Sequence, residues 1–187
     1  MNKSPFKILV TGVESTGKSE LVKFLADSLN LPFTREFARK YLEGLNRDYS
    51  REDLDAILIG QLDLENKALN LASAESCEAV ICDTGPEVLY IWSEHKFGKV
   101  SVLIQRALIE FDYDLVLLTD VDLEWTPDIQ RETPGLEERQ VLLNKYKTLL
   151  QRVGVSYCII SGHGASRFAL AKKRVEEFLN KKSPQQS

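Results

Sequence analysis

Eight residues near the start of the chain have the types and spacing of a phosphate-binding loop. The segment Gly12-Val13-Glu14-Ser15-Thr16-Gly17-Lys18-Ser19 matches the pattern G-x-x-x-x-G-K-S/T at every fixed position. The two glycines allow turns that a Cβ would obstruct, so backbone N–H groups of the loop can converge on phosphate oxygens. Lys18 can reach the β- and γ-phosphates, and the Ser19 hydroxyl can ligate Mg²⁺. The loop therefore predicts a site for a nucleoside triphosphate, ATP or GTP, with Mg²⁺.

The residues on either side of this loop support the prediction. The apolar, β-branched run 6–11 is typical of a buried strand, and apolar residues recur at helical spacing over 18–29. A glycine turn followed by an ordinary helix cap is the structural alternative. A strand directly before the loop and a helix directly after it favour the nucleotide site.

Asp83 is the second candidate for chemistry. It follows the continuous apolar run 79–82, which predicts a buried strand with an acid at its carboxyl end. In a phosphate-loop protein such an acid can hold Mg²⁺, orient the attacking group, or act as the base for a substrate hydroxyl. The alternative is a turn or cap residue, because Asp83-Thr84-Gly85-Pro86 has turn chemistry.

Further charged candidates lie on two other segments. Glu36 follows a short predicted strand and could accept a hydrogen bond from an acceptor hydroxyl; it could equally be a first-turn acid paired with Arg39. Arg131 and Arg139 lie on or beside the polar segment 120–136, where arginines could close over phosphates. A solvated charged loop is the alternative for that segment.

Strand and helix patterns alternate along the chain, which predicts an α/β sandwich around a parallel sheet with its site at the carboxyl ends of the strands. The expected strands are 6–11, 31–35, 79–82, 115–119 and 157–161. The expected helices are 18–29, 36–42, 51–73, most of 87–111 with a break at Gly98, 137–152 and 166–179. Residues 120–136 are expected to form a long mobile loop.

Length and composition restrict the class of protein. The 187 residues predict a single domain over 1–180 and a polar, disordered tail over 181–187. A net charge of −4 argues against a nucleic-acid partner, and no apolar run has the length of a membrane helix. We expect no signal peptide, and the three widely spaced cysteines suit a reducing, cytoplasmic environment. The sequence does not predict an oligomeric state.

Several motifs occur together in one order. They are the phosphate loop, Arg35-Glu36-Phe37-Ala38-Arg39, Cys82-Asp83-Thr84, Tyr113 to Leu118 and Trp125-Thr126-Pro127-Asp128-Ile129-Gln130-Arg131. Over about 6–180 the chain resembles the ATP-dependent ribosylnicotinamide kinase domain of the bacterial bifunctional NAD-biosynthesis regulator and the AAA-type P-loop ATPase-like family grouped with it.

The resemblance implies a three-layer fold like that of nucleoside and nucleotide kinases, with a five-stranded parallel sheet of order 2-3-1-4-5 and a lid. It implies transfer of the ATP γ-phosphoryl group to the ribose 5′-hydroxyl of nicotinamide riboside (NR). It places Asp83 by the acceptor hydroxyl, Arg131 in the lid and the Gly162 loop near adenine. Deoxynucleoside kinases have a similar Glu after strand 2, which favours a catalytic Glu36.

Two positions depart from the family pattern. Arg35 stands where some members have an aromatic residue, and Gly85 stands where the family has a second acid. We therefore expect a kinase for a nucleoside-like small molecule; a regulatory, nucleotide-dependent switch without a small acceptor is the alternative. The expected catalytic residues are Lys18, Glu36, Asp83 and Arg131. The expected ATP-binding residues are Gly12, Glu14, Ser15, Thr16, Gly17, Lys18, Ser19, Arg131, Arg139 and Gly162, with Ser19 and Asp83 on the metal.

Overall fold

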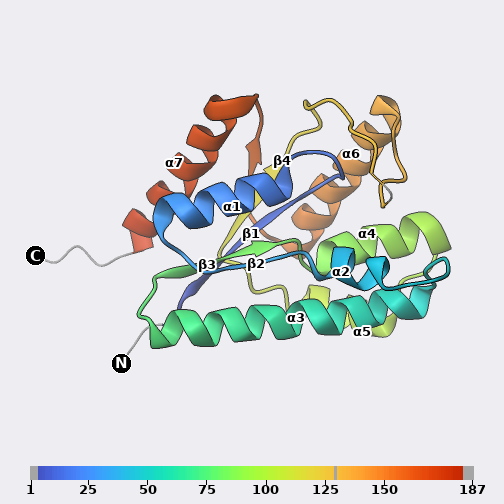
Figure 1. The fold of residues 1–187 in the computed structure, drawn as a ribbon, viewed down its shortest axis with the longest axis horizontal. Coiled ribbons are helices and arrows are strands. Elements are labelled where there is room, and N and C mark those ends of the chain that lie inside the picture. The colour runs from blue at the N-terminus through green and yellow to red at the C-terminus, as the bar shows by residue number, and fades with distance from the viewer. Residues whose placement is uncertain (1–3, 129, 183–187) are drawn as a thin grey trace, which may run out of the picture.

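A five-stranded parallel sheet forms the centre of the fold in the computed structural model, which describes residues 4–128 and 130–182 (Figure 1). The strands are β1 (Phe6–Gly12), β2 (Phe33–Thr34), β3 (Ala79–Asp83), β4 (Leu115–Thr119) and β5 (Tyr157–Ile160). Their order is β2-β3-β1-β4-β5, which confirms the predicted order. The register places Asp83 beside Val10 and Thr119 beside Gly12, so the candidate residues converge at one edge.

Helices cover both faces of the sheet because successive strand residues point to opposite sides. On one face Ile8, Val10 and Ile81 pack against α1 (Lys18–Leu29) and α7 (Gly164–Lys182). The strand residues that alternate with these pack against the other helices. Those helices are α3 (Arg51–Ala74), α4 (Pro86–Phe97), α5 (Val102–Ile109) and α6 (Leu136–Val153). Figure 1 shows α1 and α7 on one side of the sheet and α3 and α5 on the other.

The predicted break within 87–111 is confirmed at Gly98. This residue has φ of 62°, a left-handed conformation that favours glycine, and it caps the end of α4. Ser101 then caps α5 by accepting a hydrogen bond from the Ile104 N–H at 3.2 Å.

The last helix is longer than predicted. α7 runs to Lys182, so residues 181 and 182 of the expected tail are helical, and 183–187 lie outside the described residues. The described part of 120–135 contains no helix or strand, as expected for a loop. Within the described ranges no helix is both long and apolar enough to cross a membrane.

Candidate active site

A cavity of about 410 Å³ lies where the strands end, and its three walls bring together segments distant in sequence. The donor wall is the phosphate loop and the start of α1: Gly12, Glu14, Ser15, Thr16, Gly17, Lys18, Ser19 and Glu20. The acceptor wall consists of residues from α2 (Phe37–Glu43), α3, α4 and α6, with Glu36 and Tyr49 beside them: Glu36, Ala38, Arg39, Leu42, Tyr49, Leu54, Ile57, Val88, Leu89, Trp92 and Tyr146. The roof, called the lid below, comes from the loop residues 120–128 and 130–135: Leu123, Glu124, Thr126, Gln130, Arg131 and Glu132.

The phosphate loop is fixed to the end of β4. Gly12 has φ of 139°, and a Cβ there would lie 2.3 Å from Thr119 Oγ1, so only glycine permits this approach. The buried Thr16 hydroxyl donates to Val13 O at 2.6 Å and lies 2.7 Å from Thr119 Oγ1. Thr16, expected as a nucleotide contact, therefore uses its side chain to anchor the loop.

Lys18 is held inside the loop that it would serve. Its ammonium group donates to Val13 O at 2.9 Å, across the loop. Lys18 is also the first residue of α1, whose free N–H groups and positive dipole end face the same space. The loop thus presents a cation and backbone donors to an anion.

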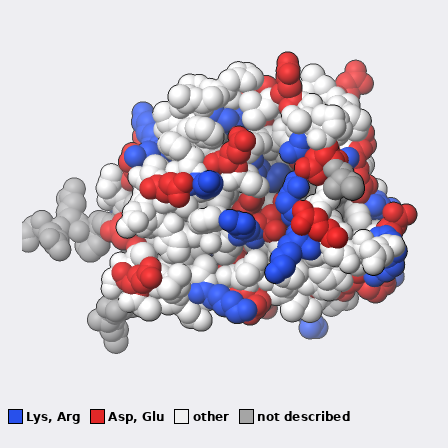
Figure 2. Space-filling model, in the orientation of Figure 1, with Lys and Arg blue, Asp and Glu red and all other residues white. Residues whose placement is uncertain are grey.

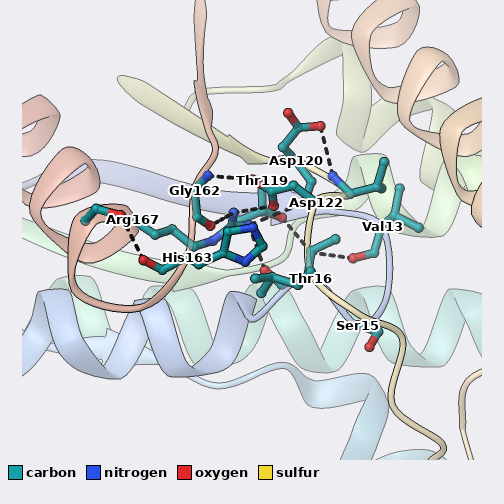
Figure 3. Close-up of polar contacts among 12 residues, drawn as sticks. Val13, Ser15, Thr16, Thr119, Asp120, Asp122, Gly162, His163 and Arg167 are labelled. Atoms are coloured by element: carbon teal, nitrogen blue, oxygen red, sulfur yellow. Dashed lines mark hydrogen bonds and ion pairs between the residues drawn. The ribbon is translucent and has the colours of Figure 1, made fainter.

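Arg167, which was not among the predicted site residues, braces this end of the sheet. Only 2% exposed, it donates to Thr16 O at 2.9 Å and to Gly162 O at 3.1 Å and pairs with Asp122 at 2.7 Å (Figure 3). The Gly162 N–H donates to the same Asp122 carboxylate. Gly162 does not line the cavity. One arginine therefore joins the phosphate loop, the start of the lid and the loop after β5.

Asp83 is buried at the end of β3 with its charge poorly compensated. It is 2% exposed, and its Oδ1 has no hydrogen-bond partner in the structure. Burial, followed by the negative charge of Glu36, raises the pKa of Asp83 to about 6, while Lys18 and the Ser19 hydroxyl oppose the rise. A carboxylate so placed can accept a cation or a proton from an incoming group.

The residues around Asp83 fit Mg²⁺. The uncompensated Asp83 oxygen and the Ser19 hydroxyl are hard oxygen donors, and Ser19 faces the cavity. Among the described residues, no group of three or more Asp, Glu, His or Cys side chains is placed to hold a metal ion. Mg²⁺ commonly takes one or two ligands from the protein and the others from substrate phosphates and water, so Ser19 and Asp83 would be enough protein ligands.

Glu36 lies at the N-cap of α2 but makes no capping hydrogen bond with its side chain. Arg39 does not pair with it; Arg39 binds Asp128 of the lid at 3.1 Å. The Phe37 N–H instead donates at 2.8 Å to the buried Gln61, whose amide group donates to Asp83 O at 3.3 Å. The Glu36 carboxylate is consequently available to the cavity, and Gln61, absent from the sequence predictions, links its helix to Asp83.

The two arginines that were predicted to close over phosphates differ in placement. Arg131 lines the cavity, and its guanidinium donates to Thr126 O within the lid. Arg139 differs from the expectation that it closes over phosphates: it is 2% exposed and lies outside the cavity lining. It donates to Leu123 O at 3.1 Å and Ser15 O at 3.2 Å. Its position on the buried face of α6 makes it a support for the loop backbone.

The departure from the family pattern at Gly85 has a structural reason. A Cβ at this position would lie 2.6 Å from the Tyr113 hydroxyl and 2.7 Å from a Glu87 oxygen. The Tyr113 hydroxyl is itself held by Glu65 at 2.8 Å. A second acid at position 85 would therefore require this buried network to move.

Basic and acidic side chains both line the cavity, in a protein whose net charge is −4. Lys18, Arg39 and Arg131 all line it. Figure 2 shows Lys and Arg side chains gathered in the middle of the face that carries α1 and α2, with acids around them. Since five glutamates also line the cavity, Lys18 and the N–H groups of the phosphate loop, rather than an overall positive field, favour an anionic ligand such as a polyphosphate.

Comparisons with known proteins find relatives over most of the chain. The chain is 24% identical over 177 residues to the trifunctional NAD biosynthesis/regulator protein NadR of Escherichia coli. The aligned region covers 92% of this chain and 42% of that relative. A crystal structure of NadR protein in complex with NR superposes with a TM-score of 0.81 and 25% identity over 95% of this chain and 52% of that one. A second crystal structure of NadR protein, in complex with NAD and AMP-PNP, superposes with a TM-score of 0.77 and 25% identity. The match covers 95% of this chain and 50% of that one.

The chain thus spans less than half the length of that curated relative. A family model described as an AAA domain matches residues 7–167, which includes the phosphate loop, Glu36, Asp83 and the lid. Since that match covers most of the 187 residues, the chain belongs to the AAA-domain family.

Proposed function

We propose that this chain is an ATP-dependent kinase that phosphorylates a hydroxyl group of a nucleoside-like acceptor, with nicotinamide riboside as the first candidate. The observation that carries the proposal is the shared cavity, in which Lys18, Glu36 and Arg131 face one space from its three walls. The bound states of NadR, with NR in one structure and AMP-PNP in another, support the same pairing of donor and acceptor.

Each wall has a part in the transfer. The phosphate loop and Lys18 bind the triphosphate, and Arg131 faces the γ-phosphoryl group from the lid. Ser19 and Asp83 would hold Mg²⁺, which supplies charge neutralisation across the phosphates when bound. The acceptor oxygen forms a bond to the γ-phosphorus while the bond from that phosphorus to the β–γ bridging oxygen breaks, and ADP leaves. The hydroxyl proton passes to Glu36 or Asp83.

The acceptor wall suits a ring joined to a sugar. Tyr49 and Trp92 contribute aromatic surface, and Leu42 and Ile57 add apolar surface. Glu36 provides a polar group that could bind ribose hydroxyls at the inner end. An aromatic base would pack on Tyr49 and Trp92 while the 5′-hydroxyl of the attached ribose approaches Glu36.

Acceptor-dependent ADP release tests the proposal. Purified protein with Mg²⁺-ATP should release ADP with nicotinamide riboside or one member of a nucleoside panel, and mass spectrometry should find the monophosphate. Lys18→Ala should reduce turnover by about a thousandfold or more, since it removes the cation at the phosphates. Lys173→Ala, whose side chain is 70% exposed on α7, is the matched control. Absence of product across the panel, or full turnover by Lys18→Ala, would count against the proposal.

A nucleotide-dependent switch is the second candidate, because α5 carries exposed apolar side chains that a partner could cover. Val102 is 64% exposed, Leu103 41% and Ile109 85%. ATP hydrolysis that needs no acceptor and is accelerated by a protein partner would favour this function over the kinase.

A further inference from the structure

Glu14, which the general phosphate-loop pattern leaves unspecified, holds three N–H groups of the lid. Its Oε1 accepts from the Thr133 N–H at 2.7 Å and from the Trp125 indole at 3.2 Å, and its Oε2 accepts from the Glu132 N–H at 3.1 Å. These donors lie 111 to 119 residues away along the chain. A carboxylate that accepts several N–H bonds makes charge-assisted contacts, stronger than those between neutral groups.

The neighbouring loop residue strengthens the same contact. The Thr126 N–H donates to Ser15 Oγ at 3.0 Å. The lid is therefore docked on the phosphate loop through both Glu14 and Ser15. The docked positions lie next to Thr126 and Arg131 in the sequence, the lid residues that line the cavity.

The opposite side of the lid is held by the acceptor wall. Arg39 of α2 pairs with Asp128 at 3.1 Å and accepts through its carbonyl from the Gln130 side chain at 2.9 Å. Tyr49 donates to Glu132 at 3.1 Å. Arg131 lies between these two sets of contacts, so its position depends on both.

Because Glu14 is charged, we expect the docking of the lid on the phosphate loop to depend on whether a nucleotide is bound. Glu14 lines the cavity wall where a triphosphate would lie, so an unpaired carboxylate there would repel the phosphates. Three N–H donors from the lid compensate that charge when the lid is docked. A bound triphosphate should consequently disfavour the undocked lid, and by linkage the docked lid should favour the triphosphate.

We propose that Glu14 is a positioning residue that couples the lid to the occupied phosphate loop and thereby sets Arg131 over the γ-phosphoryl group. Docking of the lid follows from the contacts themselves, and only the consequence for turnover rests on the proposed kinase function. Glu14 thus acts through the lid, whereas Lys18 acts on the phosphates directly.

Amide hydrogen exchange by NMR tests the coupling without turnover. Glu14→Gln keeps one oxygen acceptor but turns an amide N–H group toward a lid N–H. In this variant the Glu132 and Thr133 amides should exchange at least about tenfold faster than in wild type, the effect of losing a charge-assisted bond. AMP-PNP with Mg²⁺ should slow these amides in wild type and much less in the variant.

Glu137→Gln is the matched control, because it makes the same change of charge at an exposed position in the first turn of α6. It should exchange as wild type. Unchanged exchange of both lid amides in Glu14→Gln would overturn the proposal. So would faster exchange spread evenly over β4 and α6, since that would indicate general loosening. Trp125→Phe, which removes one donor from the lid side, should also speed the two amides and provides a second variant.

Kinetics give the catalytic consequence. With the acceptor found above, Glu14→Gln should lower kcat at least about tenfold, as expected when a catalytic group is displaced, while the Kd of AMP-PNP changes less than about threefold. An equal loss in Kd and kcat would assign Glu14 to nucleotide binding alone and contradict its role on the lid. If no acceptor is phosphorylated, the kinase function fails while the exchange measurement still decides the role of Glu14.

Discussion

At the scale of single residues, Asp83 pairs a candidate catalytic role with a cost in stability. An aspartate whose pKa is raised in the folded state is more easily ionised after unfolding. Below its ordinary pKa both states are protonated and there is no penalty. The penalty grows as pH rises toward about 6, the folded pKa, and stays constant above it.

Asp83→Asn should therefore stabilise the fold at neutral pH while lowering kinase turnover. The expected gain in the free energy of unfolding is about 2 kcal/mol near pH ~7.5, falling toward zero near pH ~4. Urea denaturation at several pH values measures it. Asp27→Asn, an exposed acid on α1, is the control and should show no such profile. A gain that is the same at both pH values would refute the link to ionisation of Asp83.

At the scale of elements, the packing of α2 on α3 places Glu36. The two helices meet where the Phe37 ring lies over Gly60, and a Cβ on Gly60 would lie 2.2 Å from that ring. A glycine within a helix normally costs about 1 kcal/mol relative to alanine. Here the glycine makes room for the residue that follows Glu36.

Gly60→Ala should destabilise the protein by about 1–3 kcal/mol, against its helix propensity, because the added methyl group overpacks the contact with Phe37. A double-mutant cycle with Phe37→Ala, read by chemical denaturation, checks the cause. In the Phe37→Ala background the same substitution should be neutral or stabilising. If the cost persists without the ring, the contact is not its origin.

The loops at the carboxyl edge of the sheet depend on Arg167. Arg167→Ala would leave the partly buried Asp122 without its cationic partner and the Thr16 and Gly162 carbonyls without this donor. We expect a loss of about 3–5 kcal/mol in the free energy of unfolding and weaker nucleotide binding, measured by thermal denaturation and calorimetry. Arg174→Ala, 45% exposed on the same helix, should cost less than about 1 kcal/mol. Equal losses for Arg167→Ala and Arg174→Ala would show that the buried contacts of Arg167 contribute no more than those of an exposed arginine.

At the scale of the whole molecule, the two ends of the sheet have different tasks. The carboxyl ends of the strands carry the cavity. Near the amino end of β1, Lys7 pairs with the buried Glu65 of α3 at 3.0 Å and with Asp112 at 2.6 Å. Its ammonium group also lies 4.2 Å from the centre of the Tyr113 ring. This cluster joins β1, α3 and the segment that leads into β4.

Lys7→Met should lower stability without altering the site. Removing one partner of a buried ion pair leaves Glu65 uncompensated, which should cost about 3 kcal/mol in the free energy of unfolding. The Kd of AMP-PNP and the kcat of the folded enzyme should match wild type. Lys67→Met, 71% exposed on α3, is the control. A change in nucleotide affinity comparable to that of Arg167→Ala would contradict this separation of tasks.

Local chemistry was enough to predict the elements of this fold. The helix over 18–29, the strand over 115–119 and the break at Gly98 follow from apolar periodicity and from glycine's tolerance of positive φ. The predicted ends of the elements were less exact. The strand expected over 31–35 is only Phe33–Thr34, because pairing with β3 rather than residue preference sets its length. The order of the strands came from a resemblance between motifs.

The sequence by itself determined that a phosphate loop, two acids after strands and an arginine-bearing loop would lie at one edge of a parallel sheet. Only the tertiary structure decided how the charged side chains divide their work. Arg139 and Arg131 belong to the same stretch of sequence, yet one is buried against loop carbonyls and the other faces the cavity. Glu14 finds its lid partners, and Arg167 finds Asp122, more than 40 residues away. Spacing along a chain encodes local geometry, whereas long-range packing selects these partners.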